Sequence, residues 1–453
     1  MIENRKAQTN MRFSSTTLGC KVNQCDTNTL DRALAERGHE RAALGAGCDL
    51  CIVNTCSVTA ESVRKSRQAI RRIKRQEQNA IIAVCGCYSE LEPDEINTLG
   101  VDFVSGTGDK AELAQELEQF VAEKSNREYS NDNQKSVHVT EQPIQFTDKQ
   151  NSVNHLPKKP TKTTRTRAFL KIQDGCDNYC AYCIIPYARG HSRSEKPENI
   201  IKEAEELYAQ GYKEIVITGI EISSFGKDLK DENLISILKK IAEVAPKTRL
   251  RIGSLDPTIL TEKFCADLAK IPSLCNHFHI SLQSGSNETL ARMGRKYKTE
   301  QVKKAMESLR KNFKDCAISA DLITGFPGEI SKEFKETLEF LEEANFSTMH
   351  IFPFSPRPRT KAAEMQNQVE KPVSKERAKA ATETANQSAK KFKETQIGKT
   401  AEVLFEQKKD GHSTGHTTNY IEVKVKGEYK RNSIKKIKLT GIENNKMTGI
   451  AES

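Results

Sequence analysis

The stretch "KIQDGCDNYCAYCIIPYARG", from Lys171 to Gly190, holds Cys176, Cys180 and Cys183 in the spacing CxxxCxxC. It continues directly from the β-rich run "AFLKI", so the three thiols lie on the loop after a predicted strand. A structural zinc site commonly takes four ligands from two paired knuckles, and no second knuckle accompanies this loop. Three thiolates on a four-iron cube leave one iron open for another ligand. The spacing therefore favours a reactive iron-sulfur cluster, with zinc or a structural role as the alternatives.

The residues around this loop predict a partial (β/α) barrel over 167–392. Each β-rich run except the last is followed by a helix-like segment, and the runs are "AFLKI", "EIVITG", "LRIGS", "HFHISLQ", "AISADLITG" and "TMHIFPF". In such a barrel the active site lies on the loops after the strands. The cysteine loop follows the first strand, which places it at the catalytic end.

The N-terminal residues 11–122 predict a doubly wound parallel sheet, because short apolar runs alternate with helix-like stretches. Three cysteines, Cys20, Cys56 and Cys87, each follow a predicted strand. Loops beyond the carboxyl ends of such strands share one edge of the sheet, so these thiols can converge on a ligand. Four others lie inside apolar runs or on helix faces and are expected to be ordinary buried thiols: Cys25, Cys48, Cys51 and Cys85.

Two further segments complete the chain. Residues 123–166 are polar, lack a sustained period and end in Lys and Pro, which is typical of a flexible linker. Residues 393–453 alternate with period two and predict a small antiparallel β-barrel. From Lys391 to Ser453 there are 13 Lys and Arg against 8 Asp and Glu, with Tyr420 and Tyr429 among them. This pattern suits an RNA-binding barrel, and an ordinary solvated barrel is the alternative.

The overall composition limits the possible classes of protein. The chain has 453 residues, 36% hydrophobic and 29% charged, and a formal net charge of +10. We expect two or three folded domains, no membrane span and no export signal. The thirteen cysteines gather in clusters, which suits a reducing cytoplasm and metal or redox chemistry. The basic balance is compatible with a polyanionic partner.

The CxxxCxxC motif with Tyr182 before its last cysteine, followed by "PYARGHSRS", resembles the radical S-adenosylmethionine superfamily, and within it the methylthiotransferases. The resemblance implies that Cys176, Cys180 and Cys183 hold a 4Fe-4S cluster whose open iron binds S-adenosylmethionine. One electron then yields a 5′-deoxyadenosyl radical that abstracts hydrogen from an unactivated C–H bond.

The resemblance covers nearly the whole chain apart from the linker. The segments "TLGCKVNQCDTN", "NTCSVTAESVRKSRQAIRR" and "VCGCYSE" are similar to the three N-terminal motifs of the methylthiotransferases. They imply that Cys20, Cys56 and Cys87 ligate a second 4Fe-4S cluster that presents or donates sulfur. Cys25 departs from an expected aromatic residue, and Cys85 stands two before the expected ligand Cys87. The tail resembles the TRAM domain, an RNA-binding barrel.

The finer motifs concern the substrate. "GCKVNQ", "NTCSVT" continuing into "RKSRQ", and "GHTTNYIEV" look most like the branch that methylthiolates threonylcarbamoyladenosine at position 37 of tRNA, beside the anticodon. That branch implies a base taken from the anticodon loop into the barrel, hydrogen abstraction at carbon 2, sulfur addition and a methyl group from a second S-adenosylmethionine. The alternatives within the family act on isopentenyladenosine in tRNA or on a ribosomal-protein Asp. No acid-base catalyst is expected.

The resemblance also implies contacts to the cofactor. "ITGIEISSFG" places Gly219 near the methionine end with Glu221 as a polar contact, "SLQSGS" brings Gln283 and Ser284 close, and "DLITGFPGE" lets Asp321 and Gly325 shape the adenosine site. In each case tight turns and helix caps are the alternative explanation.

Several arginines are candidates for RNA phosphate. Four have the spacing of one helix face, and two lie in loop-like polar segments: Arg64, Arg67, Arg71 and Arg75, then Arg193 and Arg295. A solvated charged face is the alternative.

The implied partners are the tRNA anticodon loop, a one-electron reductant of flavodoxin or ferredoxin type, a sulfur donor and the iron-sulfur assembly machinery, in the cytoplasm. The competing classes are a non-catalytic iron-sulfur RNA-binding protein, which would not need the full (β/α) series, and a redox or zinc-regulated scaffold, which would show four-ligand sites.

Overall fold

The computed structural model describes residues 10–129, 138–139 and 166–452, which divide into two compact units. The first unit combines the N-terminal part of the chain with Gly175–Asp177 and Ile184–His191. The second combines Thr164–Asp174, Asn178–Cys183 and Ser192–Ser453. The cysteine loop therefore contributes to both units. Among the described residues, no helix has the length and apolar character needed to cross a membrane.

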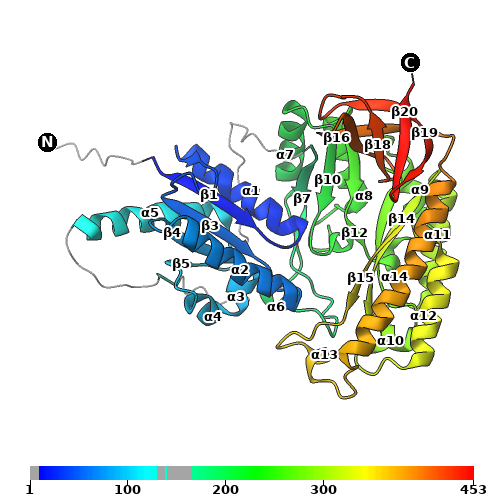
Figure 1. Cartoon of the computed structure of the whole chain (residues 1–453), viewed down its shortest axis with the longest axis horizontal. Coiled ribbons are helices and arrows are strands. Elements are labelled where there is room, and N and C mark those ends of the chain that lie inside the picture. The colour runs from blue at the N-terminus through cyan, green and yellow to red at the C-terminus, as the bar shows by residue number, and fades with distance from the viewer. Residues whose placement is uncertain (1–9, 130–137, 140–165, 453) are drawn as a thin grey trace. The chain divides into compact units, whose positions relative to one another are not determined.

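The first unit is built on a parallel sheet in the order β2-β1-β3-β4-β5-β6 (Figure 1). The strands are β1 (Arg12–Thr17), β2 (Glu40–Arg41), β3 (Leu50–Thr55), β4 (Ile81–Gly86), β5 (Phe103–Val104) and β6 (His138–Val139). The helices are α1 (Lys21–Glu36), α2 (Ala60–Gln76), α3 (Cys87–Leu91), α4 (Pro93–Asn97) and α5 (Lys110–Tyr129). The predicted doubly wound parallel sheet is confirmed.

Two apolar cores lie on the two faces of this sheet. On one face α1 and α5 pack on the strands, with Phe13, Leu34 and Leu117 fully buried. On the other face α2 and α3 pack on them, with Ile70 and Tyr88 buried. The apolar residues of β3 and β4 face both cores, which is why these central strands read as continuous apolar runs.

The end of this unit differs from the prediction. The helix α5 continues to Tyr129, and β6 pairs in parallel with β5. The predicted linker boundary at residue 123 is therefore too early, because the polar composition of 123–129 hides a helix that begins in the apolar stretch before it. The remaining predicted linker, 130–137 and 140–165, lies outside the described residues.

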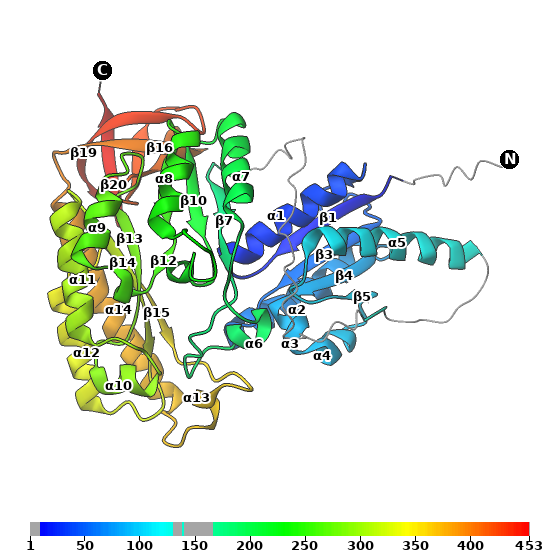
Figure 2. The same ribbon diagram turned by 180° about the vertical axis from the view of Figure 1, so that it is seen from behind.

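The second unit contains the predicted partial (β/α) barrel, which is confirmed (Figure 2). Its parallel strands form two adjoining sheets, β11-β10-β7 and β12-β13-β14-β15. The strands are β7 (Ala168–Lys171), β10 (Glu214–Thr218), β11 (Arg249–Ile252), β12 (Ser254–Leu255), β13 (His277–Gln283), β14 (Ala317–Thr324) and β15 (Thr348–Pro353). A short antiparallel pair joins β8 (Gln173–Asp174) to β9 (Arg193–Ser194).

Helices cover the outer face of this barrel (Figures 1 and 2). They are α7 (Pro197–Ala209), α8 (Leu234–Val244), α9 (Glu262–Ala269), α10 (Asn287–Arg292), α11 (Thr299–Asn312) and α12 (Ser331–Ala344). The second unit also contains the 3-10 turns η1 (Ile222–Ser224) and η2 (Pro257–Ile259), whereas the short α6 (Ile185–Arg189) belongs to the first unit. Contrary to the sequence pattern, the last strand is also followed by helices, α13 (Lys361–Glu364) and α14 (Lys371–Glu394). The helix α14 packs against β15 and α12.

A five-stranded closed barrel ends the chain, in the order β16-β17-β18-β20-β19. Its strands are β16 (Thr400–Lys409), β17 (His412–Thr417), β18 (Glu422–Lys426), β19 (Ile434–Glu443) and β20 (Lys446–Ala451). All pairings are antiparallel except β18 with β20. Closure leaves no exposed sheet edge and confirms the predicted small barrel. Tyr429 stacks on Phe405 with a centroid distance of 4.4 Å, so its ring packs against the barrel core while part of it stays exposed.

Candidate cluster-binding sites

The first cysteine triad lies at the carboxyl ends of three neighbouring strands. Cys20 caps α1 after β1, Cys56 follows β3, and Cys87 begins α3 after β4. The strand order reverses direction between β1 and β3, and the crevice at such a switch point is where open α/β sheets bind ligands. The predicted convergence therefore has a topological cause.

One buried amide side chain ties this triad together. Asn23 is fully buried, and its Oδ1 lies 3.8 Å from the sulfur of Cys20 and 3.9 Å from that of Cys87. Its Nδ2 donates to the carbonyls of Leu18 and Thr55, at 2.9 Å each, at the ends of the same strands. Asn23 is thus held rigidly between two thiols.

Cys56 completes the triad at a close backbone approach. A Cβ at Gly19 would lie 2.8 Å from the Cys56 sulfur, and the φ angle of Gly19 is +101°. Only glycine tolerates both conditions. The loop before Cys20 therefore approaches Cys56 as closely as a backbone can, and the donor set of three thiols beside one amide fits an iron-sulfur cluster.

A buried arginine also contacts this triad. Arg189 is 3% exposed, and its Nε lies 3.3 Å from the Cys87 sulfur. Its Nη2 donates to Asp26 Oδ2 at 2.8 Å and to Asn23 Oδ1 at 2.7 Å. The charge is thus compensated inside the protein, and the guanidinium is aimed at a sulfur. Sequence reasoning missed Arg189, Asn23 and Asp26, although Arg189 lies in the quoted motif "PYARG".

Burial keeps two of these thiols protonated in the free chain. It raises the pKa of Cys87 to about 12, which the Arg189 guanidinium partly opposes, and it raises the pKa of Cys56. Cluster assembly must then release these protons, because iron binds the thiolate.

The structure separates Cys85 from Cys87. Cys85 packs in the apolar core beneath α1 and α5, whereas Cys87 contacts Asn23. Cys85 lies within β4, whereas Gly86, with a φ of +101°, ends the strand and Cys87 already belongs to α3, so the chain changes direction between the two thiols. Cys25, Cys48 and Cys51 are buried, as predicted.

The second triad lies on the loop from Gly175 to Cys183. The Cys183 N–H donates to the Cys180 carbonyl at 2.9 Å, and the Cys176 N–H donates to the Gly190 carbonyl at 3.1 Å. Arg295 Nη1 lies 3.3 Å from the Cys180 sulfur, and its Nη2 pairs with Asp256 at 3.0 Å. Arg295 was predicted to meet RNA phosphate. This is wrong, because its side chain is only 6% exposed and already paired.

Two predicted cofactor contacts lie beside this loop. Asn178 donates to Glu221 Oε2 at 3.3 Å, while the other Glu221 oxygen caps η1. Burial raises the pKa of Glu221. A Cβ at Gly219 would lie 2.9 Å from the Gln173 carbonyl oxygen, so the turn requires glycine there. Tyr182 packs against the apolar cluster of Ala181, Met293, Phe326 and Ala362, and burial raises its pKa.

The structure also describes the other four residues that were predicted to contact the cofactor. Gln283 ends β13 with a φ of +68°. Ser284 is buried, and its hydroxyl accepts from the Ser286 N–H at 3.2 Å. A Cβ at Gly325 would meet the Ser374 hydroxyl at 2.3 Å. Asp321 lies mid-strand in β14 and pairs with His279. Among these residues, Gln283 and Asp321 keep partly exposed side chains.

The arginine stripe on α2 is exposed and partly paired. Arg64 donates to Glu61, and Arg67 donates to Glu95 at 2.5 Å. Arg71 and Arg75 are exposed further along the helix. Arg193 is half exposed and lies 3.4 Å from Asp174. A solvated face explains the first two, and none of these side chains lies in a core.

Tyr420 is engaged on several sides in the second unit. Its ring stacks on His416 at 4.7 Å and lies 4.9 Å from His277. Arg251 and Arg167 lie over the same ring, 4.7 and 5.0 Å from its centroid. These contacts anchor the C-terminal barrel on the strands of the (β/α) barrel.

Comparisons with known proteins agree with this layout. The model described as the radical SAM superfamily matches residues 170–341, and the one described as uncharacterized protein family UPF0004 matches residues 12–106. The radical S-adenosylmethionine methyltransferase TsrM from Kitasatospora setae superposes with a TM-score of 0.57 at 16% identity, covering 78% of this chain and 77% of that chain. That likeness concerns the fold alone.

Two groups of relatives match almost end to end. The threonylcarbamoyladenosine tRNA methylthiotransferase MtaB of Bacillus subtilis is 38% identical, over 91% of this chain and 89% of that protein. Its namesake in Thermotoga maritima is 36% identical, over 92% and 91%. The tRNA-2-methylthio-N(6)-dimethylallyladenosine synthase of Clostridium novyi is 32% identical, over 89% and 87%.

Proposed function

Because the chain belongs to the radical SAM methylthiotransferase family, we propose that it methylthiolates carbon 2 of threonylcarbamoyladenosine at position 37 of tRNA, next to the anticodon. Relatives at 33–38% identity carry this activity in their names. Radical SAM members use a 4Fe-4S cluster and S-adenosylmethionine, and the methylthiotransferases carry two clusters. The enzyme class is therefore established, and the base that it modifies is the proposal.

The names of those relatives carry the choice of base, and the gathering of Cys20, Cys56 and Cys87 near Gly19 and Asn23 supports the enzyme class. A radical SAM enzyme needs only the CxxxCxxC triad to cleave its cofactor. A second thiol triad at the switch point of a separate sheet gives the chain a place to hold sulfur for transfer. A non-catalytic RNA-binding protein would require neither two thiol triads nor the complete series of strands in the (β/α) barrel.

The residues around the second triad fit the cofactor. Cys176, Cys180 and Cys183 would hold the cluster, which with bound S-adenosylmethionine supplies the radical that removes the hydrogen at carbon 2. Arg295 fixes Cys180 through a hydrogen bond and is itself fixed by Asp256. Glu221, bonded to Asn178 of the cysteine loop, presents a carboxylate beside it. Gly219 keeps the turn free of a side chain.

The residues of the first triad would hold the sulfur-presenting cluster. Arg189 donates to one ligand sulfur and to Asn23, so it stabilises negative charge on the sulfurs without moving a proton. The buried Asp26 keeps the guanidinium in place. These groups bind and orient, and none of them is required as a general base.

The partners follow from the same proposal. The C-terminal barrel would act as a TRAM-like module that holds tRNA, assisted by Arg71, Arg75 and Arg193. Turnover would need a flavodoxin or ferredoxin type reductant, a sulfur donor and the iron-sulfur assembly machinery. We place the reaction in the cytoplasm.

A second candidate substrate is isopentenyladenosine, because relatives at 30–32% identity are named tRNA-2-methylthio-N(6)-dimethylallyladenosine synthase. Mass spectrometry of tRNA nucleosides from cells with and without the gene decides between them. Loss of 2-methylthio-threonylcarbamoyladenosine alone supports the proposal. Loss of the isopentenyl product alone overturns it, and persistence of both points to a protein substrate.

A further inference from the structure

A row of polar side chains lines the inner face of the barrel strands. Along β13 the partly exposed His279, Ser281 and Gln283 alternate with Phe278, Ile280 and Leu282, which are buried in the core under the helices. The same alternation puts Asp321 on the inner face of β14 and His350 on that of β15. Apart from Gln283, which ends β13, these polar residues lie within their strands, before the loops that carry the cofactor contacts.

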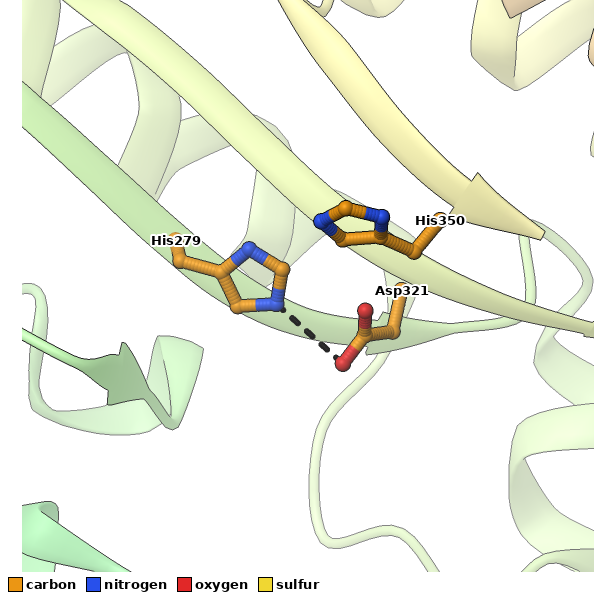
Figure 3. A group of neighbouring side chains, drawn as sticks. All are labelled: His279, Asp321 and His350. Carbon is orange, nitrogen blue, oxygen red and sulfur yellow. Dashed lines mark ion pairs between the residues drawn. The ribbon is translucent and has the colours of Figure 1, made fainter. Parts of the chain in front are cut away.

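Three of these side chains converge, as Figure 3 shows. The ligating atoms of His279, Asp321 and His350 all lie within 4.8 Å of one another. Asp321 and His350 are direct partners in the register of β14 and β15, and His279 is opposite Ser319, two residues before Asp321. Strand register therefore creates the cluster, which no local sequence pattern reveals.

His279 is fixed within this cluster from both sides of its ring. Its Nε2 lies 3.1 Å from Asp321 Oδ2, and its Nδ1 lies 2.9 Å from the Ser319 hydroxyl. Ser319 is in turn 3.0 Å from His277 Nε2. Such a chain of hydrogen bonds orients the imidazole and leaves Asp321 one carboxylate oxygen for another partner.

His350 is the open member of the cluster. Its ring faces that of His279 with centroids 5.9 Å apart. It is exposed, and within the described part of the chain no hydrogen bond to its nitrogens is seen. The cluster thus offers a fixed acceptor at Asp321 and an imidazole donor at His350, both reachable from the barrel interior.

His279 lies on β13, the strand that also supports the cysteine loop. Arg295 donates to the Cys180 sulfur and to the Ser281 carbonyl, both at 3.3 Å. Ser281 is two residues after His279 on β13, a rise of about 7 Å. A base that reaches the radical at the loop would therefore place its substituent near this cluster.

We propose that His279, Asp321 and His350 form the subsite that binds the threonylcarbamoyl group of the target adenosine. This proposal rests on the proposed function. The threonylcarbamoyl group carries a carboxylate, a hydroxyl and amide N–H groups. Asp321 accepts from the hydroxyl or N–H, His350 donates to the carboxylate, and His279 holds Asp321 in place.

The same cluster disfavours an isopentenyl group. A hydrocarbon chain would strip water from Asp321 and His350 and offer no hydrogen bond in return, and unpaired buried polar groups are costly. Sites built to hydrogen-bond a substrate reject analogues that lack the partner far more strongly than apolar pockets reject an added polar group. The cluster is thus the specificity element for the substituent.

The test uses the holoenzyme, with both clusters assembled without oxygen, and two anticodon stem-loop RNAs that differ only in carrying threonylcarbamoyl- or isopentenyladenosine at position 37. The readout is kcat/KM for the 2-methylthio product of each RNA. The variants are His350→Phe, which keeps a ring without its nitrogens, and Asp321→Asn. The matched control is Glu339→Gln, which also removes one carboxylate charge but lies exposed on the outer helix α12.

Wild type and Glu339→Gln are expected to prefer the threonylcarbamoyl RNA. In His350→Phe and Asp321→Asn the ratio of the two kcat/KM values should fall at least tenfold, mostly through KM for the threonylcarbamoyl RNA. An unchanged ratio in both variants would overturn the subsite while leaving the proposed function standing. A wild type that modifies only the isopentenyl RNA would overturn the proposed function itself.

A divalent cation could be held by the same ligand atoms of His279, Asp321 and His350. One more measurement therefore distinguishes a metal site from a substrate subsite. Mn²⁺ is titrated into the holoenzyme and followed by EPR. Binding of one ion per chain in wild type that disappears in His350→Phe would overturn the subsite proposal, because the metal would occupy the cluster. Absence of such binding in both proteins is the expected result.

Discussion

Arg189 Nε lies 3.3 Å from the sulfur of Cys87, although 102 positions separate the two residues in the chain. The arginine belongs to the segment just after the CxxxCxxC motif, and the cysteine belongs to the N-terminal sheet. Arg295 has the same relation to Cys180, at 3.3 Å. Each thiol triad therefore has one buried guanidinium, anchored by an aspartate, that donates to a ligand sulfur.

Replacing Arg189 by Gln is expected to make the reduction potential of the N-terminal cluster more negative, because the cation favours the more negatively charged reduced state. A loss of about 1.5 kcal/mol, the lower end of the range for a hydrogen bond to a charged group, corresponds to about 65 mV for one electron. EPR-monitored titration measures it in a chain with Cys176, Cys180 and Cys183 changed to Ala. Arg189→Lys, which keeps the charge, should shift less, and equal potentials in all three proteins would contradict the role.

Asp26→Asn tests the anchor of that arginine. The change leaves the Arg189 charge buried without its counter-ion, which is expected to cost about 3–5 kcal/mol of folding free energy. Denaturant unfolding, followed by a spectroscopic signal from the first unit, measures the loss of unfolding free energy. Glu61→Gln breaks the exposed pair with Arg64 and serves as the control, for which we expect no shift of the midpoint. Equal midpoints for both variants would show that the buried pair contributes nothing.

Glu195 provides a prediction about pH. Burial raises its pKa from 4.5 to about 7, and its Oε2 has no hydrogen-bond partner among the described residues. Between pH 4.5 and 7 the folded protein holds a proton that the unfolded chain has released, so stability falls as pH rises. Glu195→Gln removes this fall and should be more stable than wild type at pH 8, by up to about 3 kcal/mol. The thermal unfolding midpoints of wild type and Glu195→Gln are measured from pH 5 to 8. A constant difference between the two midpoints over this range would refute the prediction.

The C-terminal barrel is expected to bind RNA through β19. Lys435, Lys436 and Lys438 are exposed there, and changing all three to Ala should weaken tRNA binding and reduce the slope of log K against log salt by about 2. Fluorescence anisotropy at several salt concentrations measures both quantities. Lys332, Lys335 and Lys379, exposed on α12 and α14, are the charge-matched control. Equal losses in both triple variants would indicate only a general charge effect.

Local patterns predicted most of the fold, because strand runs and helix periods depend on neighbouring residues. The positions of Cys20, Cys56 and Cys87 at strand ends followed from the same patterns and from the topology of parallel sheets. Contacts between distant segments were not predictable in this way. Arg295 resembles any polar loop residue until Asp256 and the Cys180 sulfur are seen beside it. His350 reads as one more strand residue until the register brings it against Asp321.

The first unit is discontinuous along the chain, since Gly175–Asp177 and Ile184–His191 belong to it. During synthesis the sheet with Cys20, Cys56 and Cys87 emerges from the ribosome well before Arg189 does. Until Arg189 has been synthesised, Asp26 and Asn23 lack the guanidinium that they bind in the folded unit, and the first triad lacks its buried positive charge. A chain truncated in the linker would lack Arg189, so we expect it to assemble the first cluster less well than the full chain does.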